Sequence, residues 1–205
     1  MDSTADRVRS YLKKQLSPKR LCHTMGTVSF ARKLAQRYGV SPDKAALAAL
    51  LHDCSKPLET AEMIRYVKRY RVPVPEKKAV EKFNPSLFHS FISADMARRL
   101  FAVRDQEILE AIALHTVAAP AMATLAKIIY IADIAAPDRH FKGVTRIRRL
   151  SKNGLDAAFH AALAAKIAHV LASRAWLHPL SVQAWNSLLA PLHKKEPLKH
   201  PHGTI

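Results

Sequence analysis

Residues 41–53 read SPDKAALAALLHD, and this stretch decides the fold. Ser41 and Pro42 are typical of a helix start, with serine as the N-cap and proline in the first turn. The apolar run that follows predicts a buried helix. His52 and Asp53 come directly after that run, so the helix carries an imidazole and a carboxylate into an apolar environment. Because an unpaired buried carboxylate is costly, Asp53 requires a cation, an arginine or a hydrogen-bond donor.

The helical period continues through most of the chain. Leu125, Ile128, Ile129 and Ala132 are spaced i, i+3, i+4, i+7, and no convincing alternation with period two is found. We therefore expect an all-α protein that forms a single helical bundle. The expected helices span residues 4–15, 22–38, 42–55, 59–70, 86–101, 104–116, 122–135, 154–174 and 181–190. Residues 72–84 and 136–153 are expected to be irregular, and His178 is expected to end a helix.

Composition narrows the class of protein. The chain has 205 residues, which suits one domain, and its formal net charge of +17 indicates an anionic partner. The five glycines stand apart, which excludes a P-loop and a dinucleotide-binding fingerprint. Two cysteines cannot form a disulfide scaffold, so a reducing cytoplasm is the simplest setting. No clean apolar run approaches the roughly 20 residues of a membrane helix, so we expect no membrane contact.

Four histidines and two aspartates stand out from the remaining polar residues. The histidines fall at or near the ends of apolar helices, and Asp133 lies four residues after Ile129 on an apolar face. The six residues are His23, His52, Asp53, His89, His115 and Asp133. A single histidine on such a face is more often a packed core residue than a ligand. Together, however, four imidazoles and two carboxylates are a suitable ligand set for divalent metal ions.

The ordered pattern H…HD…H…H…D resembles the HD-domain phosphohydrolases, and within them the YqeK-like family. The strings RLCHTMGT, AALLHDCSK, HSFISADMARRL, EILEAIALHT, LAKIIYIADIAAPDR and HPLSVQAWN carry the resemblance over about residues 18–190. It implies an HD-domain helical bundle with a dinuclear metal centre in its core. The metal is often iron, with manganese, magnesium or another divalent ion as alternatives. It also implies symmetrical hydrolysis of diadenosine tetraphosphate to two ADP.

The resemblance assigns the residues as follows. His23, His52, Asp53 and Asp133 would hold one ion, whereas His89 and His115 would hold a second, with Asp53 bridging. Asp53 and Lys56 would be catalytic, and a metal-activated water would attack phosphorus. Lys56, Thr116, Arg139 and Arg20 would bind the substrate. Alternatives for these four stay open, because Thr116 could cap a helix and the cationic side chains could simply be solvated.

The resemblance also divides the chain into segments. Residues 1–17 would form an N-terminal helix, residues 18–192 the HD phosphohydrolase domain, and residues 193–205 a basic mobile tail. Two places depart from the family pattern. Val117 and Ala118 stand where the family usually has threonine and glycine, and Trp185 stands where arginine is common. These changes leave the proposed metal ligands intact but alter the surroundings of the nucleotide.

Two other functions compete with the dinucleoside polyphosphate hydrolase. One is an HD phosphohydrolase that acts on another nucleotide, such as a nucleoside phosphate or a cyclic nucleotide. The other is a basic, non-enzymatic RNA-binding module. It would use Arg139, Lys142, Arg146, Arg148, Arg149 and Lys152, followed by Lys194, Lys195 and Lys199. Nucleic acid is not the favoured partner, because a binding module would not need six intact ligands. The sequence leaves open whether the protein is a homodimer.

Overall fold

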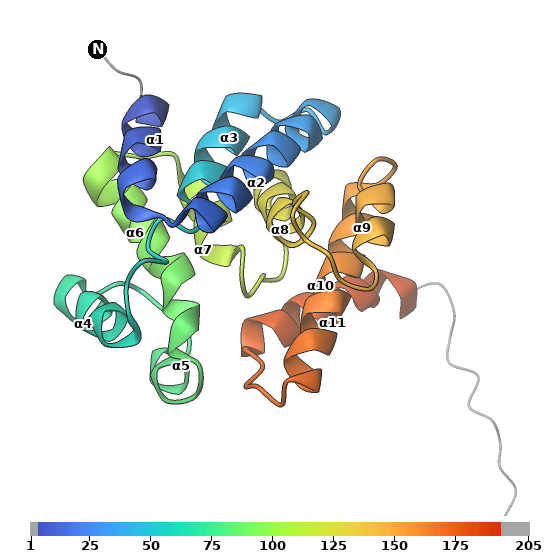
Figure 1. Cartoon of the computed structure of the whole chain (residues 1–205). Coiled ribbons are helices and arrows are strands. Elements are labelled where there is room, and N and C mark those ends of the chain that lie inside the picture. The colour runs from blue at the N-terminus through green and yellow to red at the C-terminus, as the bar shows by residue number, and fades with distance from the viewer. Residues whose placement is uncertain (1–3, 194–205) are drawn as a thin grey trace, which may run out of the picture.

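The computed structural model describes residues 4–193, and every regular element in that range is helical. The prediction of an all-α fold is confirmed. The helices are α1 (Thr4–Gln15), α2 (Pro18–Arg37), α3 (Pro42–Leu51), α4 (Thr60–Tyr70), α5 (Lys77–Phe83), a 3-10 turn η1 (Pro85–Leu87), α6 (Phe88–Phe101), α7 (Gln106–Leu114), α8 (Thr124–Ile134), α9 (Val144–Leu150), α10 (Leu155–Ala172) and α11 (Pro179–His193). Figure 1 shows α2, α3, α7 and α8 grouped in the middle of the molecule.

Helix α3 forms the centre of the bundle. Six of its ten residues are buried, and four of those six are alanines, whose small side chains let neighbouring helices approach closely. It packs against α2, α7 and α8, and also touches α1 and α6. The helix begins as predicted, because Pro42 follows Ser41, and the Ser41 hydroxyl accepts a hydrogen bond from the Lys44 amide at 3.3 Å.

Two short helices lie where irregular segments were expected. Helix α5 falls within residues 72–84 and α9 within residues 136–153. Each has only seven residues, so neither shows a sustained period in the sequence. Helix α5 buries only Val80, and α9 buries Val144 and Ile147 between exposed arginines. Their stability therefore comes from packing on the bundle rather than from a clear amphipathic pattern.

Two helix boundaries near the candidate site differ from the expected ones. Helix α2 begins at Pro18 rather than at residue 22, because Ser17 caps it as Ser41 caps α3. Helix α3 ends at Leu51 rather than at residue 55. The Ser55 amide donates to the Ser93 hydroxyl at 3.2 Å, and the Ser55 hydroxyl donates to the His89 carbonyl at 2.8 Å. These bonds to α6 replace the continuation of α3.

The structure describes the first and last helices of the bundle, α1 and α11. Helix α1 packs against α3 and α6, with Val8 and Leu12 buried. Helix α11 runs to His193, beyond the expected residue 190, so most of the expected tail, residues 194–205, lies outside the described residues.

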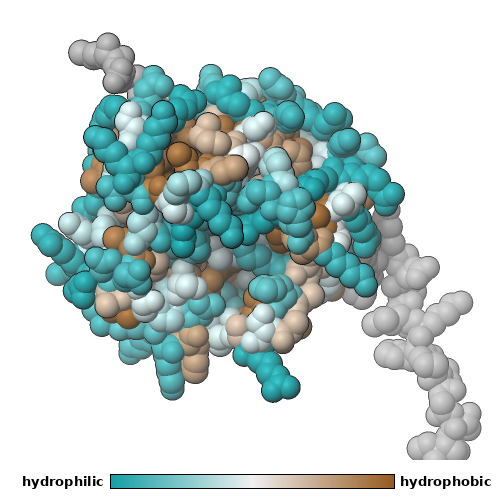
Figure 2. Space-filling model, viewed as in Figure 1, coloured by the Kyte–Doolittle hydropathy of each residue, from teal (hydrophilic) through white to brown (hydrophobic). Residues whose placement is uncertain are grey.

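Helix α10 is long and apolar enough to span a membrane by length and composition alone. It packs against α8, α9 and α11 and buries Phe159 and Leu163, so it is an integral helix of the bundle. Figure 2 shows that the visible face of the molecule is mostly hydrophilic, with apolar side chains in separate patches.

His178 directly precedes α11, which begins at Pro179, and so does not end a helix as the sequence had led us to expect. Its Nδ1 accepts a hydrogen bond from the Leu180 amide at 3.1 Å, and its Nε2 lies 3.3 Å from the Pro75 carbonyl. The ring is therefore neutral, with the proton on Nε2. Burial lowers the pKa of His178 below its ordinary value, although the contacts with Pro75 and Glu76 oppose this.

We expect His178 to make the protein less stable in mild acid. As the pH falls through about 6.5, the unfolded chain gains a proton that the folded protein resists. Between pH 7.5 and 5.5, wild-type protein should therefore lose more stability than His178→Asn, by at most about 1.4 kcal/mol per pH unit. Urea unfolding at both pH values measures this, with the exposed His169→Asn as the control. Equal pH dependence in all three proteins would contradict the expectation.

Candidate metal centre

Five helices bring the six predicted ligands together in the middle of the bundle. His23 lies within α2, His52 and Asp53 directly follow α3, His89 lies in the first turn of α6, His115 directly follows α7, and Asp133 lies in the last turn of α8. The four histidines and Asp133 are buried, and the Asp53 side chain is 18% exposed. Three of the five helices place their ligands at or near their C-terminal ends.

The ligand atoms form two groups that share Asp53. One group contains His23, His52 and Asp53, and the other contains Asp53, His89 and His115. Within each group, one ligand atom from each residue lies within 4.8 Å of the others. Ligands that bind one ion at about 2.0–2.2 Å lie roughly 3–4 Å apart, so either group requires only small adjustments around an ion.

Asp133 belongs beside the first of these groups. Its Oδ1 lies 3.0 Å from His23 Nε2 and 4.0 Å from His52 Nε2. On the other side of the centre, Asp53 Oδ1 lies 3.3 Å from His89 Nε2 and 3.5 Å from His115 Nε2. The structure therefore places Asp133 beside His23 and His52, and places Asp53 beside His89 and His115.

Unsatisfied polar atoms show that these residues fit a metal ion. His52 Nε2 and Asp53 Oδ1 are both buried, and neither has a hydrogen-bond partner among residues 4–193. Buried polar atoms in proteins are rarely left without a partner, because the loss of hydration is not compensated. A divalent cation between these atoms would satisfy both of them. Imidazole and carboxylate together suit divalent ions such as iron, manganese and zinc.

Backbone hydrogen bonds orient three of the four imidazoles. Each ring donates its Nδ1 proton to the carbonyl three residues earlier: His52 to Ala49 at 2.7 Å, His115 to Ile112 at 2.7 Å, and His89 to Ser86. The proton on Nδ1 leaves Nε2 with its lone pair, and Nε2 is the atom that faces Asp53. Such outer hydrogen bonds fix the tautomer and direction of a metal-binding histidine.

Burial also sets the protonation states of the centre. It lowers the pKa of His89 to about 3 and the pKa of His52 below its ordinary value, so both rings are neutral at pH 7. Burial acts to raise the pKa of Asp53, but the neighbouring imidazoles, above all His52, hold that pKa well below its usual range. A buried carboxylate anion beside neutral imidazoles is the state that binds a cation.

The predicted substrate-binding residues lie at different distances from this centre. The Arg139 guanidinium donates to Asp133 Oδ1 at 2.8 Å and lies 3.3 Å from His23 Nε2. The Thr116 hydroxyl lies 3.1 Å from His89 Nε2. Lys56 is half-buried in the turn that follows Asp53, whereas Arg20 is exposed one turn before His23. Arg139 thus engages two candidate ligands, which the sequence did not indicate.

Two further residues near the centre were missed in the sequence. Asp138 accepts a hydrogen bond from the His23 ring, and its only signal is its place beside Arg139. Lys166 lies on α10, with its ammonium 5.7 Å from the centre of the Tyr130 ring. Burial lowers the pKa of Lys166, although the nearby charge of Asp133 opposes this. Lys166 is the one lysine or arginine in the apolar stretch 157–172, which could have marked it.

The departures from the family pattern lie in the loop after α7 and on α11. Val117 and Ala118 are buried, and the Val117 carbonyl accepts a hydrogen bond from the Ser181 hydroxyl at 2.7 Å, which ties the loop after His115 to α11. Ala118 has a φ of 60°, a left-handed conformation that glycine adopts without steric cost. The Trp185 ring packs on His160, with centroids 4.6 Å apart, between α10 and α11.

We expect Asp53→Ala to remove most bound metal, because this residue belongs to both groups of ligand atoms. His89→Ala should instead remove about one of the expected two ions per chain. Elemental analysis of purified proteins measures this, with Asp43→Ala as the control, since Asp43 is exposed and pairs only with Arg32. Full metal content in Asp53→Ala would show that this carboxylate is not a shared ligand.

Known proteins resemble this chain over most of its length. The model of the HD domain matches residues 20–138. The chain is 37% identical over 147 residues to the symmetrical bis(5'-nucleosyl)-tetraphosphatase of Bacillus subtilis, which covers 72% of this chain and 77% of the relative. It is 32% identical over 181 residues to the protein of the same name from Halalkalibacterium halodurans, which covers 87% of this chain and 93% of the relative.

A solved structure of an HD superfamily hydrolase has a similar fold. The crystal structure of a predicted HD superfamily hydrolase from Clostridium acetobutylicum superposes with a TM-score of 0.86 at 31% identity. The superposition covers 93% of this chain and 99% of that chain. The match to the HD domain and the identity to these relatives confirm the resemblance seen in the sequence, and the chain belongs to the HD-domain family.

Proposed function

We propose that the protein is a metal-dependent hydrolase that cleaves diadenosine tetraphosphate symmetrically into two ADP. The observation that carries this proposal is the buried Asp53 carboxylate, which is shared by two groups of ligand atoms. Relatives at 37% and 32% identity bear the name of symmetrical bis(5'-nucleosyl)-tetraphosphatase, which supports the choice of substrate. Other dinucleoside polyphosphates are the same class of substrate.

The proposed ligands divide between two divalent ions, with iron as the favoured metal. His23, His52, Asp53 and Asp133 would hold one ion, and Asp53, His89 and His115 would hold the other. When bound, two such ions provide a nucleophilic water near neutral pH and neutralise charge on the phosphoryl oxygens. The protein's own contribution would be to hold the Asp53 carboxylate ionised and to orient His52 and His115, whose Nδ1 protons are donated to backbone carbonyls so that Nε2 stays free for an ion.

Several side chains beside the centre suit a polyphosphate chain. Thr116 and Lys56 lie next to the His89 and Asp53 side of the centre, and Arg139 lies on the Asp133 side. We assign them to phosphate contacts, with Arg20 at the outer edge of α2. Lys56 also takes part in catalysis by stabilising negative charge that develops on a phosphoryl oxygen. Arg139 can do so only if its bond to Asp133 is rearranged or shared.

A small cavity lies beside the centre, between Thr116 and the loop before α11. Thr116 and Lys166 provide polar groups in its wall, and Leu87, Val170 and Trp176 provide apolar surface. The α5–α6 side and the α10–α11 side of the molecule both contribute to it, and the surface in Figure 2 is hollowed between these sides. Polar groups next to a metal centre and apolar side chains beyond them match the phosphate and nucleoside parts of a nucleotide.

Product analysis tests the proposal directly. Purified protein loaded with Fe²⁺ or Mn²⁺ is incubated with diadenosine tetraphosphate, and the products are separated by anion-exchange chromatography. We expect ADP as the only product, at two molecules per substrate, and no turnover by Asp53→Asn. Formation of AMP and ATP would contradict symmetrical cleavage. Preferential turnover of nucleoside phosphates or cyclic nucleotides would favour the other HD phosphohydrolase activity.

We expect Lys166→Met to weaken the binding of substrate while leaving the metal content unchanged. Loss of a charge-assisted contact of about 1.5–3 kcal/mol corresponds to a rise in KM of roughly 10–100-fold, with a smaller change in kcat. Lys127→Met is the matched control, because Lys127 lies on α8 and pairs with exposed Asp156 at 2.7 Å. Steady-state kinetics with diadenosine tetraphosphate measure both parameters. An unchanged KM in Lys166→Met would show that Lys166 does not contact the substrate.

The structure gives less support to an RNA-binding module. Two of the basic residues proposed for RNA contact are engaged inside the protein, Arg139 with Asp133 and Arg148 with backbone carbonyls. Retention of single-stranded RNA by protein that does not hydrolyse any nucleotide would favour that module.

A cytoplasmic setting agrees with a nucleotide substrate and with the free thiols of Cys22 and Cys54. Homodimer formation remains a prediction.

A further inference from the structure

His23 needs a different orienting partner from the other three histidines. His52 and His115 directly follow helix ends, where the last carbonyls have no partner within the helix and can accept from the ring. His23 instead lies inside α2, which spans Pro18–Arg37. The carbonyls of the preceding turn are used there by the N–H groups of the helix itself. The Nδ1 proton of His23 therefore requires an acceptor from elsewhere in the chain.

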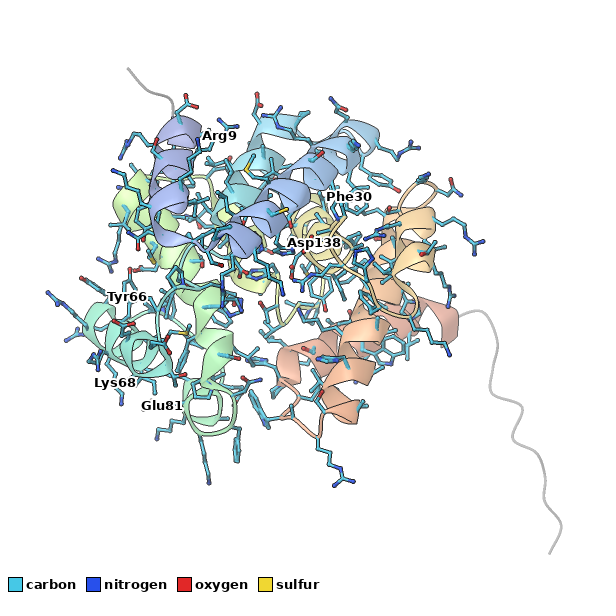
Figure 3. The ribbon with its side chains drawn as sticks, in the orientation of Figure 1. Arg9, Phe30, Tyr66, Lys68, Glu81 and Asp138 are labelled. Carbon is cyan, nitrogen blue, oxygen red and sulfur yellow. The ribbon has the colours of Figure 1, made fainter. Side chains whose placement is uncertain are left out.

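Asp138 provides that acceptor from the loop between α8 and α9. Its two carboxylate oxygens lie 3.1 and 3.0 Å from His23 Nδ1. On the other side of the ring, His23 Nε2 lies 3.0 Å from Asp133 Oδ1. Figure 3 shows Asp138 near the middle of the molecule, where its loop meets α2. A carboxylate on Nδ1 leaves Nε2 free for a metal and makes the ring a stronger ligand.

The loop that carries Asp138 is held against α2 by two features. Gly26 allows close approach, because a Cβ atom there would lie 3.2 Å from Pro137 Cδ and 3.8 Å from Asp138 Oδ1. Arg148 on α9 holds the loop from the other side, since its guanidinium donates to the carbonyls of Ala135, Ala136 and Arg139 at 3.0, 2.6 and 2.9 Å. The position of Asp138 is thus fixed by the backbone and not only by its bond to His23.

We propose that Asp138 is a positioning residue of the metal centre: its carboxylate fixes the His23 ring so that Nε2 binds the ion beside Asp133. The inference rests on the proposed metal centre but not on the identity of the substrate. The turn from Pro137 to Arg139 then acts on both nitrogens of His23. Asp138 accepts from Nδ1, and Arg139 lies beside Nε2 and Asp133.

Metal titration of the purified full-length protein tests this role. Binding of Mn²⁺ is followed by the electron paramagnetic resonance signal of the free ion, in wild-type protein and in Asp138→Ala and Asp138→Asn. We expect Asp138→Ala to weaken one of the two sites about 10–100-fold and to leave the other unchanged. Asp138→Asn should weaken it less, because the amide oxygen can still accept the proton. Activity lost at low Mn²⁺ should return at high Mn²⁺.

The Nδ1 proton of His23 provides a readout that does not depend on metal. In the metal-free protein the ring lies between two carboxylates, with Nδ1 facing Asp138 and Nε2 facing Asp133. Nitrogen-15 NMR should therefore show a hydrogen-bonded Nδ1 proton in wild-type protein, and in Asp138→Ala this proton should exchange rapidly with water or be lost. Asp156→Ala is the matched control, because it removes one carboxylate that pairs only with Lys127. If Asp138→Ala does not fold, the Mn²⁺ titration and the NMR measurement are made on Asp138→Asn instead.

The possible failures are distinguishable. Wild-type affinity for both ions in Asp138→Ala, or an unchanged signal of the His23 Nδ1 proton, would overturn the role of Asp138 alone. Failure of wild-type protein to bind Mn²⁺ would overturn the metal centre itself. Metal binding without cleavage of diadenosine tetraphosphate would overturn only the proposed function and leave the role of Asp138 intact.

Discussion

The rest of the structure depends on the burial of one carboxylate, Asp53, among imidazole rings. An ionised carboxylate in such a place is unfavourable unless positive charge or donors surround it. The bundle provides ligand atoms from both sides, with Nε2 of His89 and His115 at 3.3 and 3.5 Å from one oxygen. Helix α3 must end at Leu51 for Asp53 to reach this position, and the bonds from Ser55 to α6 bring that ending about.

Much of this arrangement could be predicted from the sequence. The helical class followed from the apolar period, and the start of α3 from Ser41 and Pro42. The six candidate ligands followed from their order along the chain, and the structure brings all six together, although their role as ligands remains a proposal. Such features can be read in a sequence because they are local, or because a family pattern preserves their order.

What could not be predicted depends on contacts between distant segments. Arg139 was expected at the substrate, but its nearest partner is Asp133, because the loop after α8 turns back toward its own helix. Asp138 has no local signal as a partner of His23, since 115 residues separate them. Helices α5 and α9 are too short to show a period, and packing decides whether they form. Such features are apparent only in three dimensions.

The distribution of ligands over five helices has a consequence for biosynthesis. His23 and Asp133 are 110 residues apart, and their side chains meet only when α2 and α8 pack together. A growing chain that has not yet reached α8 therefore presents an incomplete set of donor atoms. Uptake of the ion beside Asp133 would then wait until α2 and α8 have packed together, and that ion would act as a late cross-link between the two helices.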